Sequence, residues 1–125
     1  MYESTFIIEG KPVTVVAVNM GLDLSISVSG GDRPHIGAVA LAISRPSLSD
    51  SDRTSATTSV LAITGHKEDE LAKMIAHGLA SSLSCNVSVS CGIHMNKINP
   101  DILTILQKQV ELEIMRIGIW YEALQ

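Results

Sequence analysis

The chain has 125 residues and a net charge of −4, with 46% apolar but only 3% aromatic residues. We therefore expect a single domain over residues 1–125 with an aliphatic core. The acidic balance without a basic cluster excludes a nucleic-acid-binding face, and the apolar stretches are too short to span a membrane. The first residues, Met1-Tyr2-Glu3, lack the basic segment of a signal peptide.

The N-terminal part of the chain reads as short strands joined by tight turns. Strand-like segments cover residues 4–9, 12–19 and 22–29, which predicts an antiparallel meander. In the segment 22–29 aliphatic and serine residues alternate, so we expect one face of the sheet to be bulky and to carry the helices. The opposite face is small or weakly polar, and it lies against solvent, a second subunit or a flat ligand.

A fourth strand is expected at residues 36–44. It alternates the bulky Val39, Leu41 and Ile43 with small residues, and we assign these three to the helix-covered face. Residues 45–57 are polar and rich in hydroxyl groups, which predicts a long exposed loop. This loop is either a plain connector or a lid over a neighbouring site.

The middle of the chain, residues 58–94, reads as a strand–helix–strand unit. Its strands are expected at 58–64 and 86–94, and its helix at 67–84. Such a crossover makes the two strands parallel, so that their carboxyl ends meet at one edge of the sheet. Open α/β sheets tend to bind ligands at this edge.

Three histidines are expected at that edge. His66 and His94 follow or end the strands of the crossover unit, and His35 precedes the strand at 36–44. If that strand pairs antiparallel with 58–64, His35 joins the other two. Neutral imidazoles bind zinc, nickel, iron or copper, so the three predict either a metal site or scattered structural histidines.

Glycines and cations around these histidines favour an anion as the ligand. Gly30 and Gly31 precede Arg33 in a loop whose free N–H groups can form an anion-binding nest. Gly65 and Lys67 flank His66 at a helix N-terminus, where unpaired N–H groups and the helix dipole attract phosphate. The two interpretations merge if a metal ion bridges the histidines and a ligand phosphate.

The C-terminal residues 99–124 are expected to form one long helix, with Asn99 as the N-cap and Pro100 at the first helical position. It carries two apolar stripes. The first consists of Leu103, Leu106, Val110, Ile114 and Ile117, and the second of Ile105, Leu112, Met115 and Ile119. One stripe covers the sheet, and the second meets the first helix or another subunit. We therefore expect a homodimer.

Together these elements predict an α+β fold. It has a single mixed, largely antiparallel sheet of about six strands, with two helices packed on one face and one strand–helix–strand crossover. The cysteines, Cys85 and Cys91, flank or lie within one strand and cannot bond to each other there. We interpret both as buried thiols, which suits a reducing cytoplasm.

Three segments of the chain, taken together, resemble one protein family. They are Gly31-Asp32-Arg33-Pro34-His35-Ile36-Gly37-Ala38-Val39-Ala40, Gly65-His66-Lys67-Glu68-Asp69 and Ser90-Cys91-Gly92-Ile93-His94. The family is that of the LpdD-like prenylated-flavin chaperones, small accessory proteins associated with hydroxybenzoate and gallate decarboxylases of the UbiD type. The resemblance runs from about residue 5 to residue 120.

The resemblance implies a non-catalytic accessory protein that binds prenylated FMN and delivers it to, or maintains it in, the large UbiD-type decarboxylase subunit. The candidate cofactor-binding residues are Gly30, Gly31, Arg33, His35, Gly65, His66, Lys67 and His94, and the candidate metal ligands are His35, His66 and His94. A divalent metal ion is an optional part of this site. Nothing in the residues distinguishes prenylated FMN from FMN.

Two other functions stay open on the residues alone. A small metal-dependent hydrolase or lyase would hold a metal ion on the three histidines and use its bound water as the nucleophile. No convincing general base lies beside them, because the acids Glu68, Asp69 and Glu70 are also expected at a helix start for dipole reasons. A purely structural protein would make no use of the histidines.

Overall fold

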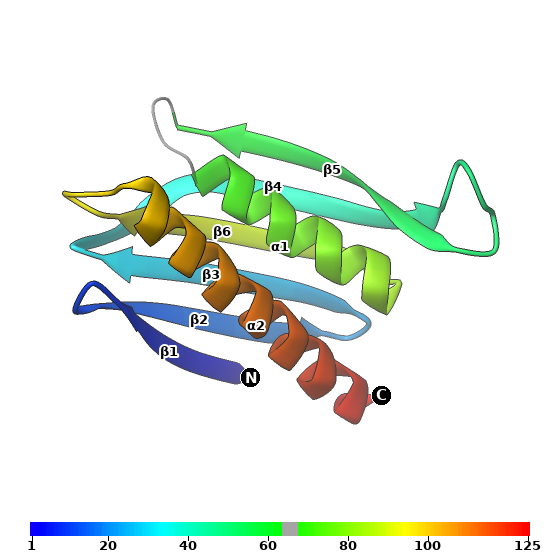
Figure 1. The fold of residues 1–125 in the computed structure, drawn as a ribbon. Coiled ribbons are helices and arrows are strands. Elements are labelled where there is room, and N and C mark those ends of the chain that lie inside the picture. The colour runs from blue at the N-terminus through cyan, green and yellow to red at the C-terminus, as the bar shows by residue number, and fades with distance from the viewer. Residues whose placement is uncertain (64–67) are drawn as a thin grey trace.

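The structure, a computed structural model, describes residues 1–63 and 68–125. It contains one six-stranded sheet and two helices, and the expected α+β fold is confirmed (Figure 1). In chain order the elements are β1 (Tyr2–Ile8), β2 (Lys11–Met20), β3 (Asp23–Gly31), β4 (Arg33–Pro46), β5 (Thr54–Ala62), α1 (Glu68–Leu83), β6 (Val87–His94) and α2 (Pro100–Leu124).

The sheet is mixed and largely antiparallel, with the strand order β1-β2-β3-β6-β4-β5. Among the strand pairs of the described residues, only β3–β6 is parallel, and the other neighbours run antiparallel. The predicted antiparallel pairing of the strands near 36–44 and 58–64 is confirmed, because Ala42 lies opposite Thr58 and Ala38 opposite Ala62. The crossover strands β5 and β6 run in the same direction, as expected, but β4 lies between them.

The connection from β3 to β4 passes over the C-terminal end of β6. Gly31, the last residue of β3, pairs with His94 on one side of β6, and Arg33, the first residue of β4, pairs with the same His94 on the other side. Asp32 alone bridges the two, and its backbone N–H donates to the carbonyl oxygen of His94 over 2.6 Å. This crossing brings residues 31–33 and the end of β6 together.

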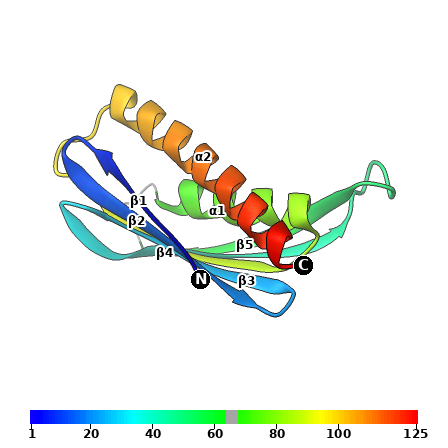
Figure 2. The same ribbon diagram turned by 90° about the horizontal axis from the view of Figure 1, so that it is seen from below.

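Both helices lie on one face of the sheet (Figure 2). Helix α1 packs on β4, β5 and β6, and α2 packs on α1 and on the β1–β2 side of the sheet. The core between the helices and the sheet is aliphatic, as the composition predicts. Its largest fully buried side chains include Ile8, Leu24, Leu79, Ile117 and Val28. In the described part of the chain, neither helix has the length and apolar character needed to cross a membrane.

The prediction of which face of β4 lies under the helices was wrong. Its buried residues are Gly37 and the alanines Ala38, Ala40 and Ala42, whereas Leu41 and Ile43 are 46% and 51% exposed on the opposite face. The reason is that α1 lies directly over β4 and is itself alanine-rich on its buried side. Small residues on both elements let the helix approach the strand closely, and the bulky residues of β4 then point away from the core.

The prediction of a long loop at 45–57 was also wrong, because the loop is much shorter. Strand β4 continues to Pro46 and β5 begins at Thr54, and these two residues lie opposite each other. Only residues 47–53 form the connection. The polar side chains here make contacts between the paired strands, since Nε of Arg45 donates to Oγ1 of Thr57 over 2.7 Å, so the composition alone indicated a loop.

Helix α2 begins as predicted, because the Oδ1 atom of Asn99 accepts from the N–H of Ile102 over 2.9 Å. Its buried stripe consists of Ile102, Leu106, Val110, Glu113, Ile117 and Tyr121, which shares Leu106, Val110 and Ile117 with the predicted one. The second stripe meets solvent rather than α1: Ile105, Leu112, Met115 and Ile119 are all exposed.

Candidate functional site

A bulge in β4 shapes the edge of the sheet at which β3 and β6 end. The three residues His35, Ile36 and Gly37 lie opposite the single residue Gly92 of β6. A Cβ atom at position 92 would overlap the carbonyl oxygen of His35, so the bulge requires glycine there. Because a bulge bends its strand and redirects side chains, it sets the orientation of His35.

The structure brings His35 and His94 together at this edge. Their ring centroids lie 6.2 Å apart, with the ring planes at 75°. The Nδ1 atom of His35 lies 3.2 Å from the carbonyl oxygen of Arg33. The Nε2 atom of His94 lies 3.1 Å from Oδ1 of Asn96. The backbone pairing of Arg33 with His94 explains this proximity, which sequence spacing alone does not reveal.

Glu68, in the first turn of α1, is buried beside His35. Its side chain is 5% exposed, and its Oε1 atom lies 3.1 Å from Nε2 of His35. Gly37 provides the space, since a Cβ atom there would lie 2.9 Å from the carboxyl carbon of Glu68. Burial, with a contribution from the Glu68 charge, raises the pKa of the Cys91 thiol to about 12. Cys91 is therefore protonated in this buried position.

An open pocket of about 340 Å³ lies over the end of β6. It is lined by Asp32, Arg33, His94 and Asn96. The Asp32 carboxylate accepts from the backbone N–H of Asn96 over 2.8 Å and lies 3.1 Å from Nζ of Lys11. The Asn96 hydrogen bond and then Lys11 hold the pKa of Asp32 below its usual value. Asp32 thus remains ionised and ties the β3–β4 connection to the segment after β6.

Gly30 and Gly31 are the last residues of β3 rather than a free loop. Gly30 has a φ of +154° and lies against the backbone of Pro12, and Gly31 has a φ of +78° and lies against the carbonyl of His94. A side chain at either position would collide with these backbone atoms. Close packing is thus a sufficient reason for both glycines, against β2 for Gly30 and against the end of β6 for Gly31, and their binding role stays a prediction.

The predicted residues Gly65, His66 and Lys67 lie outside the described residues. Within residues 1–63 and 68–125, no group of three or more His, Cys, Asp or Glu side chains is placed to hold a metal ion. Both ring nitrogens of His35 lie beside oxygen atoms, of Arg33 and Glu68. The described residues therefore do not fit a metal ion, whereas Arg33 and His94 in the open pocket fit a phosphate group.

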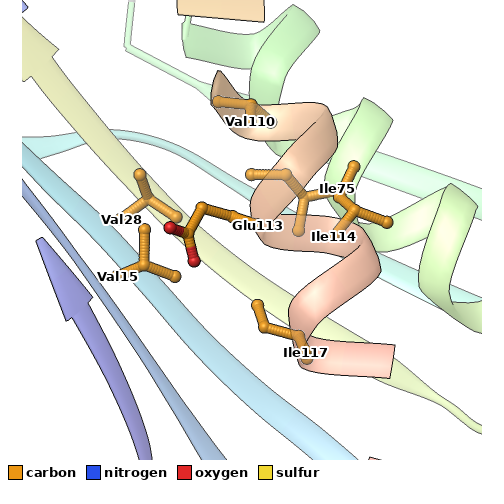
Figure 3. Close-up of a pocket in the computed structure, with 7 residues that line it drawn as sticks. All are labelled: Val15, Val28, Ile75, Val110, Glu113, Ile114 and Ile117. Atoms are coloured by element: carbon orange, nitrogen blue, oxygen red, sulfur yellow. The ribbon is translucent and has the colours of Figure 1, made fainter. Parts of the chain in front are cut away.

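A second, much smaller cavity lies under α2 and is no ligand site. It has a volume of about 10 Å³, and Figure 3 shows Glu113 among the aliphatic side chains that line it. This space is about that of a single water molecule. The Glu113 carboxylate accepts from the hydroxyl of Tyr2 over 2.6 Å and from that of Ser4 over 2.8 Å. Through these two hydrogen bonds, Glu113 links β1 to α2.

Asp32, Glu68 and Asn96 were missed as site residues by the sequence reasoning. Glu68 was set aside because an acid in a first helical turn is common for dipole reasons. The one signal for it was Gly37, a glycine inside a strand-like run, which often marks a bulge or a close approach. Nothing in the sequence indicated Asn96, which acquires its place only because the chain crosses over the end of β6.

Comparison with known proteins places the chain in a family. No curated protein sequence matches it. Among solved structures it is similar to a chain of a novel chaperone complex for yeast 20S proteasome assembly, at a TM-score of 0.58 and 13% identity, over 96% of each chain. That likeness shows a shared fold. The model of the prenylated flavin chaperone LpdD-like domain matches residues 8–121, so the chain belongs to this family.

Proposed function

We propose that this protein binds prenylated FMN as cargo and delivers it to, or maintains it in, a UbiD-type aromatic acid decarboxylase. The phosphate of the cofactor binds in the open pocket at the end of β6, through Arg33 and His94. The protein itself is a non-catalytic accessory component. The family membership supports the flavin chaperone role, and the pocket supports the place of binding.

The observation that carries this proposal is the pocket lined by Arg33 and His94, with His35 beside it. A phosphate requires cationic and N–H donors, and the planar guanidinium of an arginine binds two of its oxygens at once. All four lining residues are polar, so this pocket suits the phosphate end of the cofactor rather than its ring system. An open pocket also suits a cargo that must leave again.

The acidic Asp32 in the same pocket does not prevent anion binding. Its carboxylate is engaged by Lys11 and by the N–H of Asn96, so its charge is largely compensated. The proposal keeps Gly30, Gly31, Gly65, His66 and Lys67 as further phosphate-binding candidates. It places the phosphate directly on protein groups, because both ring nitrogens of His35 already lie beside oxygen atoms of the protein.

We further propose that the chain acts as a homodimer in the cytoplasm. Two apolar surfaces are exposed, on α2 and on the outer face of the sheet, and at least one of them suits a second subunit. The free, buried Cys85 and Cys91 suit a reducing compartment.

The test is an anaerobic titration of the purified protein with prenylated FMN, with FMN as the comparison ligand. We expect Arg33→Ala to raise the Kd for prenylated FMN by roughly 10- to 100-fold, because a charged hydrogen bond contributes about 1.5–3 kcal/mol. His35→Ala and His94→Ala should weaken binding less. Arg53→Ala and His77→Ala are matched controls, since Arg53 lies in the 47–53 connection and His77 contacts Thr58 on the helix side of β5.

The results separate the competing functions. Unchanged binding in Arg33→Ala and His94→Ala would show that the phosphate lies elsewhere, and absence of binding by the wild type would reject the cargo role. Binding that appears only with added divalent metal would restore the metal site on His35, His66 and His94. Transfer is tested by mixing the loaded protein with an apo-decarboxylase of the UbiD type, whose activity should then appear.

A further inference from the structure

The segment that follows β6 is held by Asp32 at two points. The backbone N–H of Asp32 donates to the carbonyl oxygen of His94 over 2.6 Å, and its Oδ2 atom accepts from the backbone N–H of Asn96 over 2.8 Å. The other carboxylate oxygen, Oδ1, lies 3.1 Å from Nζ of Lys11. These contacts, which we call the Asp32 clamp, fix the backbone of residues 94–96 relative to the β3–β4 connection.

The side chain of Asn96 projects from this fixed backbone and holds the ring of His94. Its Oδ1 atom lies 3.1 Å from Nε2 of His94. An amide oxygen can only accept a hydrogen bond, so the ring nitrogen that faces it carries the hydrogen. Within residues 1–63 and 68–125, no protein group is hydrogen-bonded to the other ring nitrogen, Nδ1. The protein therefore engages one nitrogen of His94 and leaves the second for a ligand.

His35, whose ring centroid lies 6.2 Å from that of His94, differs in this respect. Its Nδ1 atom lies 3.2 Å from the carbonyl oxygen of Arg33, and its Nε2 atom lies 3.1 Å from Oε1 of Glu68. Both of its nitrogens thus have protein partners, and it is His94 that lines the open pocket. Of these two histidines, His94 is the one placed to donate to a bound phosphate.

The Asp32 clamp gives a reason for an acid in a pocket that binds an anion. The side chain of Asp32 is only 18% exposed, and both of its oxygens have partners. A hydrogen bond from a backbone N–H to a carboxylate is shorter and stronger than one between neutral groups. A carboxylate at this position therefore supports Asn96 more rigidly than an uncharged side chain does.

We infer that Asn96 is a positioning residue of the phosphate site: it holds the ring of His94 through Nε2, so that Nδ1 is the nitrogen that meets the phosphate. The inference rests on the phosphate site of the proposed function. A neutral ring with its hydrogen on Nε2 presents a lone pair at Nδ1, so the phosphate binds the imidazolium form, which a nearby anion favours. A ring that is already oriented loses less conformational freedom on binding.

The first test uses the full chain without any cofactor. NMR relaxation of the ring C–H groups at about pH 8, where an ordinary histidine is neutral, measures how rigidly the ring of His94 is held. We expect an order parameter of about 0.85 in the wild type and below about 0.6 in Asn96→Ala. Asn96→Asp keeps an acceptor oxygen at the same reach and should restore the rigid ring.

Two substitutions of Asp32 test the clamp in the same way. Asp32→Ala removes the acceptor for the N–H of Asn96, so the ring of His94 should become mobile. Asp32→Asn keeps an acceptor oxygen and should leave the ring more rigid than Asp32→Ala does. Far-UV circular dichroism checks that all variants are folded.

The second test adds prenylated FMN or inorganic phosphate and follows the two ring nitrogens of His94 by ¹⁵N NMR. With either probe, Nδ1 should move to the position of a nitrogen that carries hydrogen, whereas Nε2 should stay in place. Asn96→Ala should raise the Kd for prenylated FMN about three- to tenfold, the value of one neutral hydrogen bond. Ile98→Ala is the matched control, because Ile98 lies in the same segment but does not line the pocket.

Three results would overturn the inference. They are a ring of His94 that is equally rigid in the wild type and Asn96→Ala, a phosphate that moves Nε2 instead of Nδ1, and an Asn96→Ala protein that binds as tightly as Ile98→Ala. A wild type that does not bind prenylated FMN would reject the proposed function, whatever the ring measurements show. If the wild type binds it and one of the three results is found, the positioning role of Asn96 alone is rejected.

Discussion

Two buried carboxylates, Glu68 and Glu113, show that the same residue type has different roles in two regions of this molecule. Their residues are 5% and 3% exposed, and both project from a helix toward the sheet. A buried carboxylate is costly unless its oxygens are hydrogen-bonded. The two differ in where their partners lie.

Glu113 is satisfied inside the core. Tyr2 and Ser4 of the edge strand β1 donate to it, and Nη1 of Arg116 lies 3.5 Å from it. Its other surroundings are aliphatic (Figure 3). Glu68 instead contacts His35, which lies at the edge of the sheet next to the open pocket. Burial alone therefore does not identify a functional carboxylate, whereas the position of its partners relative to an open pocket does.

The largest effect is expected from Glu113→Ala. It leaves the hydroxyls of Tyr2 and Ser4 without their acceptor and enlarges a cavity already present under α2. We expect a loss of about 3 kcal/mol in the free energy of unfolding, measured with urea. The affinity for prenylated FMN should be unchanged in the folded protein.

Two variants control this prediction. Glu113→Gln keeps an acceptor of the same shape and should cost about 1 kcal/mol. Glu111→Ala, on the exposed side of the same helix, should stay within about 0.5 kcal/mol of the wild type. Equal stability of the Glu113→Ala and Glu111→Ala proteins would contradict a structural role for Glu113.

A smaller effect, on binding rather than on stability, is expected from Glu68→Ala. Without the carboxylate, the ring of His35 loses the contact that holds Nε2, and we expect the Kd for prenylated FMN to rise by about tenfold. Calorimetric titration measures the change. Because the substitution also removes a negative charge near a bound phosphate, a purely electrostatic effect has the opposite sign.

The sign of the result therefore decides the role of Glu68. Tighter binding would mean that Glu68 only opposes the anion, and the positioning role would be wrong. Asp69→Ala is the matched control, since Asp69 lies in the same first turn of α1 and its Oδ1 atom accepts from the N–H of Glu70. The ring resonances of His35, followed by NMR, should move in Glu68→Ala and remain in place in Asp69→Ala.

The smallest effect is expected from pH, acting on the Glu113 region. Burial and then the hydrogen bond to Glu113 raise the pKa of Tyr2 above its usual value of 10.0. The folded state thus favours the neutral phenol. Its contribution to stability is complete below pH 10 and is lost as the pH rises through the pKa of the folded state.

The measurement compares the wild type with Tyr2→Phe in urea unfolding, below and above pH 10. The wild type should lose more stability over this range. Burial also raises the pKa of Tyr121, but that contribution is present in both proteins and cancels in the difference. Parallel pH profiles would show that the Tyr2–Glu113 contact contributes nothing to stability.

Local patterns in the sequence determined the elements of this fold. Alternation identified β3 and β6, the 3.6-residue period identified both helices, and the polar side chain of Asn99 marked the start of α2. These features depend on residues close together in the chain, so they are readable without the fold. The proximity of His35 and His94 was also anticipated, on the assumption that the strand at 36–44 pairs antiparallel with 58–64, although in the structure it arises from the pairing of β4 with β6.

The tertiary structure alone decided which face of β4 is buried and which acidic residues are buried against partners. The facing of Leu41 depends on how closely α1 approaches, and the burial of Glu68 and Glu113 depends on partners far away in sequence. The pocket exists because the β3–β4 connection passes over the end of β6 and places Asp32 and Arg33 beside His94. Periodicity reports which residues share a face, but only packing determines what that face meets.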